Sequence, residues 1–240
     1  MTTKLYLANR SLTALALVEA VSGGDRPSVV LSQTIFHPQG GGQKADTGAL
    51  HFETGARLPA YAGEAYFFEI ERDQVRVTDV RHEPDGASVV HLVDDVSRLS
   101  PGMTVLLSVD AEPRRMHNLL HSAGHLLAGV VEEMSPGLKA GAGRHWPGEA
   151  WVEFDGQVDD LPQFEGRLDA AMRLAITRGL PITIDAWADG GRHVAIGGAM
   201  RLRCGGTHIE NTSELAGFRL KTVRSRRGVL RVSYDIEAQA

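Results

Sequence analysis

The chain has 240 residues, 42% of them hydrophobic and 23% charged, which is typical of a globular protein with a substantial core. A net charge of −5 disfavours a protein that coats nucleic acid, and no stretch approaches the roughly 20 apolar residues of a membrane span. The apolar run 12–21 is expected to be a strand and not a signal peptide, because Thr13 and Glu19 interrupt it and the residues before it do not form a convincing basic n-region. The single cysteine cannot form an internal disulfide, so we expect a reducing compartment, the cytoplasm.

Short β-favouring runs, separated by Gly, Pro and Asp, dominate the first 110 residues. They lie at 5–7, 14–21, 29–35, 65–70, 74–80, 88–92 and 105–109. Their number and spacing predict a small β-barrel or sandwich.

The pattern changes after Asp110. Apolar residues recur at helical spacing over 112–134, and Ser135-Pro136-Gly137 ends that helix. A second helix is predicted near 161–178, with strands near 150–154, 182–186, 194–196, 218–226 and 228–236. The sequence therefore predicts the α+β class, with a β-barrel-like domain at 1–110, which carries a Gly-rich loop, and an α+β domain at 111–240.

Two pairs of metal-ligand residues share the same interval. His121 and His125 lie one helical turn apart, so both imidazoles can reach one ion. Cys204 and His208 flank Gly205-Gly206, which favours a tight turn over a helix. One thiolate and three imidazoles suit tetrahedral zinc better than the oxygen-preferring cations, so we expect one Zn²⁺ per chain.

His117 leaves the choice of helix pair open. It lies one turn before His121, so spacing allows either 117/121 or 121/125, although 117 and 125 are about 12 Å apart and cannot bind the same ion. Ten histidines give roughly 0.4 chance matches to His-x-x-x-His, whereas one cysteine gives roughly 0.04 to Cys-x-x-x-His. The second pair is therefore the more specific signal, and helix histidines without a ligand role are the plainer alternative for the first.

Two further segments have both a functional and a structural interpretation. Gly40-Gly41-Gly42-Gln43 could bring backbone N–H groups and an amide close to a ligand, or could be a turn between strands. Basic residues are frequent over 201–231 and could contact RNA phosphates, or could form a solvated face. We select five of them as candidate RNA-binding residues: Arg219, Lys221, Arg224, Arg226 and Arg227.

Three motifs together resemble a known family. His-Ser-Ala-Gly-His-Leu-Leu at 121–127 and Arg-Cys-Gly-Gly-Thr-His-Ile-Glu-Asn-Thr-Ser-Glu at 203–214 are similar to the zinc motifs of the alanyl-tRNA synthetase editing domain and of its free-standing relatives, the AlaX trans-editing proteins. The segment Phe-His-Pro-Gln-Gly-Gly-Gly-Gln-Lys-Ala-Asp-Thr-Gly at 36–48 resembles the family's Gly-rich motif. His37, Gln39 and Gly124 depart from the usual tyrosine, glutamate and threonine, which bears on substrate preference and not on the ligands.

The resemblance implies the 121/125 pair, with Cys204 and His208, as zinc ligands. It implies an editing domain of the type that is the second additional domain of threonyl- and alanyl-tRNA synthetases. The expected reaction is hydrolysis of the ester in Ser-tRNA(Ala), with Gly-tRNA(Ala) as a second substrate, at the acceptor end of the tRNA. The candidate substrate-binding residues are Gly40, Gly41, Gly42, Gln43, Asp46 and Thr207, and no catalytic residue is assigned.

Two other classes of protein are compatible with some of these residues. A zinc amidase or esterase of small molecules is disfavoured because Ser122 stands where the glutamate of HExxH would lie. A non-catalytic tRNA-binding module with a structural zinc is consistent with four protein ligands, which leave no open position. The length excludes an aminoacylation domain within these 240 residues, so we expect action in trans.

Overall fold

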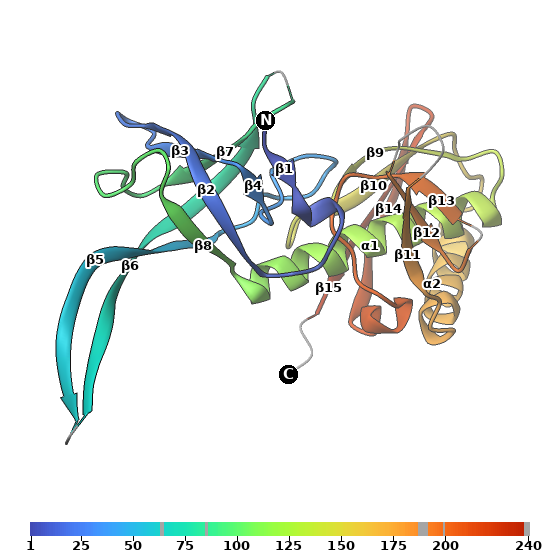
Figure 1. Ribbon diagram of the computed structural model, residues 1–240. Coiled ribbons are helices and arrows are strands. Elements are labelled where there is room, and N and C mark those ends of the chain that lie inside the picture. Colours follow the sequence, from blue (N-terminus) through green and yellow to red (C-terminus); the bar gives the residue numbers. More distant parts are fainter. Residues whose placement is uncertain (63–64, 85, 187–191, 199, 238–240) are drawn as a thin grey trace. The chain divides into compact units, whose positions relative to one another are not determined.

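A computed structural model describes residues 1–62, 65–84, 86–186, 192–198 and 200–237, with side chains left out at 54–72 and at 186. The chain divides into two compact units, Met1–Gln39 with Ala45–Pro113, and Gly40–Lys44 with Arg114–Ala240 (Figure 1). The division lies close to the predicted boundary at 110/111, but residues 40–44 group with the second unit and not with the first. No described helix is both long and apolar enough to cross a membrane.

The first unit is a closed barrel of six antiparallel strands in the order β2-β3-β7-β6-β5-β8. The strands are β2 (Thr13–Ser22), β3 (Ser28–Leu31), β5 (Gly48–Ala62), β6 (Ala65–His82), β7 (Val89–Val93) and β8 (Thr104–Val109). Alternate residues of these strands fill the interior, as in the Val105-Leu107-Val109 series of β8. Beyond the barrel, β5 and β6 pair only with each other and continue as a long two-stranded ribbon (Figure 1). The barrel and the α+β class are confirmed.

Several local predictions for this unit were wrong. Residues Leu5–Leu7, predicted as a strand, form a 3-10 helix (η1), because three apolar residues are too few to show a period. The run 29–35 is broken into β3 and the short β4 (Gln33–Thr34), which pairs with β1 (Thr3–Lys4). The runs 65–70 and 74–80 are one strand, β6, and β5 was missed altogether. Pro59 obscures β5 in the sequence, yet Pro59 lies where β5 pairs with β6 alone.

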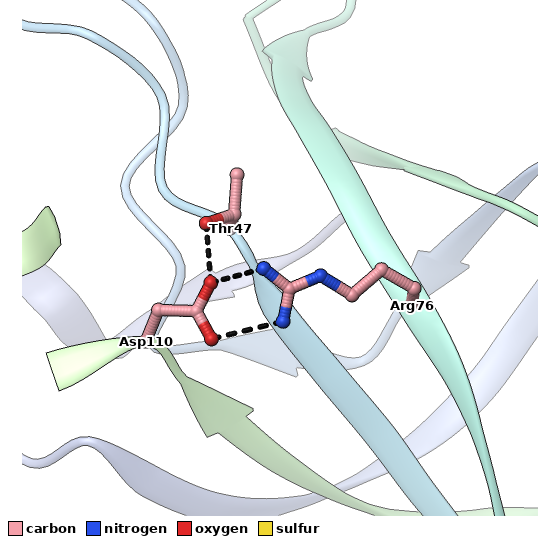
Figure 2. Close-up of polar contacts among 3 residues, drawn as sticks. All are labelled: Thr47, Arg76 and Asp110. Atoms are coloured by element: carbon pink, nitrogen blue, oxygen red, sulfur yellow. Dashed lines mark hydrogen bonds and ion pairs between the residues drawn. The ribbon is translucent and has the colours of Figure 1, made fainter.

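A forked ion pair joins β6 to the end of β8 in the first unit. Both terminal guanidinium nitrogens of Arg76 donate to the Asp110 carboxylate, and the Thr47 hydroxyl donates to the same group (Figure 2). The hydrogen bond from Arg76 is the main reason that the pKa of Asp110 lies below its ordinary value. The pair is partly exposed, so its contribution is at most about 1 kcal/mol.

His91 of β7 is a buried neutral imidazole in the barrel. Its Nδ1 faces the carbonyl oxygen of Val29, which can only accept, so Nδ1 carries the proton and Nε2 accepts from the Thr34 hydroxyl at 2.7 Å. Burial lowers the pKa of His91 to about 4. Protonation would reverse the bond with Thr34, whose hydroxyl would then accept from Nε2, and would place a charge in the core.

We expect His91 to make the barrel acid-sensitive. Its pKa is lower in the folded state than the unfolded value of about 6.5, so its contribution is complete above about pH 6.5 and is lost as the pH falls toward 4. The maximal slope from one such group is about 1.4 kcal/mol per pH unit. Urea unfolding between pH 5 and pH 7 should show a shallower dependence in His91→Gln than in the unchanged protein. Equal slopes in the two proteins would contradict this assignment.

The second unit packs two helices and a three-stranded sheet with a four-stranded sheet. The helices are α1 (Ala111–Met134) and α2 (Leu161–Thr177), close to the predicted bounds. The larger sheet has the order β14-β15-β10-β9, and the smaller one β11-β12-β13. The strands are β9 (Lys139–Arg144), β10 (Ala150–Asp155), β11 (Ile182–Ala186), β12 (Arg192–Ile196), β13 (Met200–Arg203), β14 (Phe218–Arg226) and β15 (Val229–Ile236), and a short 3-10 helix, η2, spans Thr212–Leu215.

Local sequence explains where helix α2 begins and ends. Asp160 caps α2 by accepting from Gln163 N, and Gly179 follows the helix with φ of +59°. The strand β9 was missed, because Lys-Ala-Gly-Ala-Gly-Arg has no β-branched or aromatic residue. Hydrogen-bonded pairing with β10 stabilises β9 as a strand although its own residues have little β-propensity.

Candidate metal centre

Helix α1 and the turn after β13 bring four potential metal ligands together. They are His121, His125, Cys204 and His208, and their ligand atoms all lie within 4.8 Å of one another. The Cys204 sulfur lies 3.3 Å from the Nε2 atoms of both His125 and His208. The Nε2 atom of His121 lies 3.5 Å from the same sulfur. A tetrahedral ion with bonds of about 2.0 Å to nitrogen and 2.3 Å to sulfur separates such atoms by about 3.5 Å, so the cluster fits one metal ion.

The cluster contains His125 and does not include His117. The rings of His121 and His125 stack with centroids 4.8 Å apart, as two imidazoles one turn apart on a helix can. His117 is buried on the same helix. Spacing left both pairs open, and the position of the Cys204 turn beside the second pair distinguishes them.

Gln43 orients His121 from the Gly-rich segment. The Thr207 backbone N–H donates to Gln43 Oε1 at 2.9 Å, which identifies that atom as the amide oxygen. His121 Nδ1 lies 2.6 Å from the same oxygen, so Nδ1 carries the proton and Nε2 is left with its lone pair toward the cluster. Such an outer hydrogen bond selects the tautomer that binds a metal.

Thr207 links three segments of the second unit. Its hydroxyl accepts from Gln43 Nε2 at 2.7 Å and donates to Asn118 Oδ1 at 2.5 Å. The Gly-rich segment, helix α1 and the Cys204 turn are therefore joined by one buried polar network. Gln43 and Thr207, both selected from the sequence as candidate substrate-binding residues, are thus direct hydrogen-bond partners.

Ser122 supports His208 in a similar way. Its Oγ lies 3.1 Å from His208 Nδ1 and accepts from the Ile209 N–H at 3.2 Å. When His208 Nδ1 donates to Ser122, the Nε2 atom that faces Cys204 is unprotonated. The serine at the glutamate position of HExxH is thus a buried structural partner of a candidate ligand.

Two of the candidate ligands, His125 and Cys204, are neutral in the metal-free protein at neutral pH. Burial, with a smaller effect of Arg192, lowers the pKa of His125 to about 4. Burial also raises the pKa of the Cys204 thiol. Since a metal binds the thiolate, metal uptake releases a proton from Cys204, and affinity should rise with pH.

Residues 40–43 form a tight turn that delivers Gln43. Gly40 and Gln43 exchange both backbone hydrogen bonds, and Gly41 and Gly42 have φ of +55° and +76°. Two central residues with positive φ define a type I′ turn, which explains the glycines at both positions. The carbonyl oxygen of Gly42 accepts from the His145 N–H at 2.9 Å, which holds the turn beside β9.

Asp46 lies in the first unit and not with the turn. Its side chain is fully buried, and its carboxylate accepts from the His37 N–H at 2.5 Å. The Asp46 N–H in turn donates to the His37 carbonyl oxygen at 3.0 Å. These bonds fix the chain that leads into residues 40–43.

His145 was not predicted and lies against the cluster. Its ring stacks on His121 with centroids 4.9 Å apart, and burial lowers its pKa to about 3. The Tyr234 hydroxyl donates to the Leu120 carbonyl at 2.9 Å, so it accepts from His145 Nδ1 at 2.6 Å. No sequence spacing relates residue 145 to the helix pair, and only the strand pairing of β9 brings it there.

Glycines make room for the His145 ring. A Cβ at Gly124 would lie 2.3 Å from His145 Cε1 and 2.7 Å from the Tyr234 hydroxyl, and a Cβ at Gly42 would lie 2.9 Å from His145 Cδ2. A threonine at 124, the residue usual in the synthetases that the motif resembles, would overlap both side chains. The departure at Gly124 is therefore explained by the His145–Tyr234 pair.

We expect Tyr234→Phe to lower the free energy of unfolding by about 1–3 kcal/mol. The ring would keep its stacking on Phe218, but the buried Nδ1–H of His145 would lose its acceptor. Urea denaturation of the metal-free protein measures the loss, and bound metal per chain should stay unchanged. Unaltered stability would mean that the hydroxyl is not the acceptor that His145 depends on.

The five candidate tRNA-binding residues lie on β14 and in the turn that follows it. Arg219 pairs with Glu237 at 2.8 Å, and Lys221 lies 3.5 Å from Asp235. Arg224 and Arg226 are exposed on the same strand, and Arg227 occupies the turn with φ of +53°. The structure thus places all five at the surface of the larger sheet.

Comparison with known proteins gives consistent relatives, although no family model matches the chain. It is 27% identical to the alanyl-tRNA editing protein AlaX-M of Methanosarcina barkeri, over 94% of this chain and 95% of that protein. It is also 27% identical to AlaX-M of Methanosarcina mazei, over 94% of this chain and 92% of the relative. A probable chloroplastic/mitochondrial alanine–tRNA ligase of Ostreococcus tauri is 29% identical over 85% of this chain.

The two kinds of relative differ in how much of them the chain covers. It spans 21% of the length of the Ostreococcus tauri ligase and nearly all of both editing proteins. The resemblance found in three motifs thus extends over the greater part of both units. The chain is similar to the AlaX-type alanyl-tRNA editing proteins along almost its whole length, and to a segment of the alanine–tRNA ligases.

Proposed function

We propose that this protein is a zinc-dependent deacylase that hydrolyses the ester of mischarged alanine tRNA in trans. Ser-tRNA(Ala) is the main substrate and Gly-tRNA(Ala) the second, and the site of action is the cytoplasm. The observation that carries the proposal is the cluster of His121, His125, Cys204 and His208, oriented by Gln43, in a chain similar to AlaX-M over 94% of its length. Its donor set and spacing suit one zinc ion, with His121 and His208 each held by a hydrogen bond at Nδ1.

A second hydrolytic site is needed because an alanine pocket discriminates poorly against a residue that is slightly smaller or adds a hydroxyl. A site with polar groups placed for the seryl hydroxyl rejects alanine, since those groups would remain unpaired in the complex. The Gln43–Thr207–Asn118 network supplies fixed polar groups at the cluster. This reasoning explains a preference for serine better than one for glycine.

The residues of the chain itself bind and orient the aminoacyl end. Gly40, Gly41 and Gly42 carry Gln43 into the site, and Gly41 and Gly205 border open space on the two turns. His125 and Cys204 are the partly exposed members of the cluster, so the acceptor end would approach from their side. When bound, zinc would hold the site in shape, and it would supply Lewis acidity at the ester only if one ligand left or the coordination expanded. The second unit would then be an editing domain of the type found as the second additional domain of threonyl- and alanyl-tRNA synthetases.

Deacylation of Ser-, Gly- and Ala-charged alanine tRNA tests the proposal, with zinc determined on the same sample. Loss of the seryl ester with Ala-tRNA spared is the expected result. A non-catalytic tRNA-binding module is the second candidate, because four protein ligands leave a tetrahedral ion without an open position. Stoichiometric zinc with none of the three esters cleaved would overturn the deacylase and favour that module.

A further inference from the structure

The exposed face of the larger sheet carries a row in which cationic and aromatic side chains alternate. The row runs through Lys44, Trp146, Arg144, Trp151, Arg231 and Arg224, in that order. The Lys44 Nζ lies 5.8 Å, and the Arg144 Cζ 4.3 Å, from the centre of the Trp146 ring. The Arg231 Cζ lies 4.2 Å from the centre of the Trp151 ring. Contacts of this length place a cation against each indole.

Strand register connects the two halves of the row. Arg144 on β9 is the cross-strand partner of Trp151 on β10, and Arg224 on β14 is the partner of Arg231 on β15. Directly opposed residues of neighbouring strands point to the same face. The opposite face is the core, where Val152, Leu230 and Val232 are buried. The row therefore crosses all four strands on the side away from the helices.

One end of the row lies at the β9 edge of the sheet and adjoins in sequence two residues that contact the candidate metal centre. Lys44 follows Gln43, the residue that orients His121, and Trp146 follows His145, whose ring stacks on His121. A ligand lying along the row would thus have one end at the β9 edge of the sheet, next in sequence to Gln43 and His145. Both tryptophans are only partly buried, so their rings are accessible.

The charges of the row favour an anionic ligand with planar groups. Arg144 pairs with Glu149 and Arg231 with Glu153, each at 2.6 Å, but these pairs are partly exposed and cost little to exchange for a phosphate. Lys44 and Arg224 have no carboxylate partner among the residues that the structure describes. Indoles that stack on bases and guanidiniums that bind phosphates are the means by which proteins hold single-stranded nucleic acid.

We propose that this row binds the unpaired 3′ end of an RNA, with bases on Trp146 and Trp151 and phosphates on the neighbouring cations. The inference rests on the proposed function for the identity of the RNA, because the acceptor end of a tRNA is single-stranded and carries the ester. Four of the six residues, namely Lys44, Arg144, Trp146 and Trp151, lie outside the basic segment that the sequence indicated.

Binding of uncharged RNA tests the row without any need for catalysis. The probes are a labelled acceptor-stem duplex with a four-nucleotide 3′ overhang and the same duplex with blunt ends, followed by fluorescence anisotropy. The overhang should strengthen binding, and Trp151→Leu and Trp146→Leu should each weaken binding of the overhang duplex by about tenfold. Arg173→Gln is the matched control, because Arg173 pairs with Asp169 on α2 and lies outside the row.

The outcomes separate this inference from the proposed function. Equal binding of the two duplexes, or an unchanged dissociation constant in both tryptophan variants, would overturn the row as an RNA site. Self-association that Trp151→Leu abolishes, with no dependence on the overhang, would also overturn it and make the face an interface between copies. Overhang-dependent binding without cleavage of any ester would support the row while the deacylase failed.

Discussion

Replacement of Cys204 by alanine is expected to abolish metal binding at neutral pH and, with it, deacylation of Ser-tRNA(Ala). The sulfur lies within 3.5 Å of the Nε2 atoms of all three candidate ligand histidines, so its loss removes one corner of the tetrahedron. Loss of an outer hydrogen bond at a metal site typically costs 10–100-fold in affinity, and loss of a ligand should cost more. We therefore expect affinity to fall by more than about a hundredfold, measured by competition with a chromophoric chelator.

His117→Gln is the matched control for this experiment. It changes a histidine of the same helix that lies outside the cluster, and it should leave bound metal per chain near one. Retention of metal by Cys204→Ala would contradict the cluster. Loss of metal in His117→Gln with retention in His125→Gln would instead favour the 117/121 pair.

Gly206→Ala is expected to disable the site although it changes no ligand. A Cβ at this position would lie 2.0 Å from His121 Cε1 and 2.7 Å from Gln43 Oε1, so the imidazole or the turn must move. Overpacking of this kind costs about 1–3 kcal/mol of stability. Because displacement of His121 also breaks its bond to Gln43, metal affinity should fall by at least about tenfold.

The neighbouring glycine supplies the control. A Cβ at Gly205 meets nothing within 4 Å, so Gly205→Ala should keep both metal affinity and thermal stability. Metal titration and thermal unfolding of the two variants side by side measure the difference. Equal behaviour of Gly205→Ala and Gly206→Ala would show that close packing of the second glycine on His121 is not required.

Helical periodicity and ligand spacing were sufficient for much of the second unit. Both helices were predicted within a few residues of their observed ends, because apolar spacing and helix-stop residues act locally. The strands at the end of the chain, β14 and β15, were also predicted, because β-favouring residues and the turn between them are local signals too. Strands that depend on a distant partner were not, as β9 and β5 show.

The sequence by itself determined the types of chemistry available to this protein: one thiol, the histidine pairs at one-turn spacing, and a Gly-rich turn that ends in Gln43. Tertiary structure decided which of these groups meet. It placed the Cys204 turn beside His125 and not His117, put Gln43 on His121, and stacked His145 on the same ring. Spacing along a helix is a local property, whereas these contacts join residues 24 to 83 positions apart, which only the packed chain brings together.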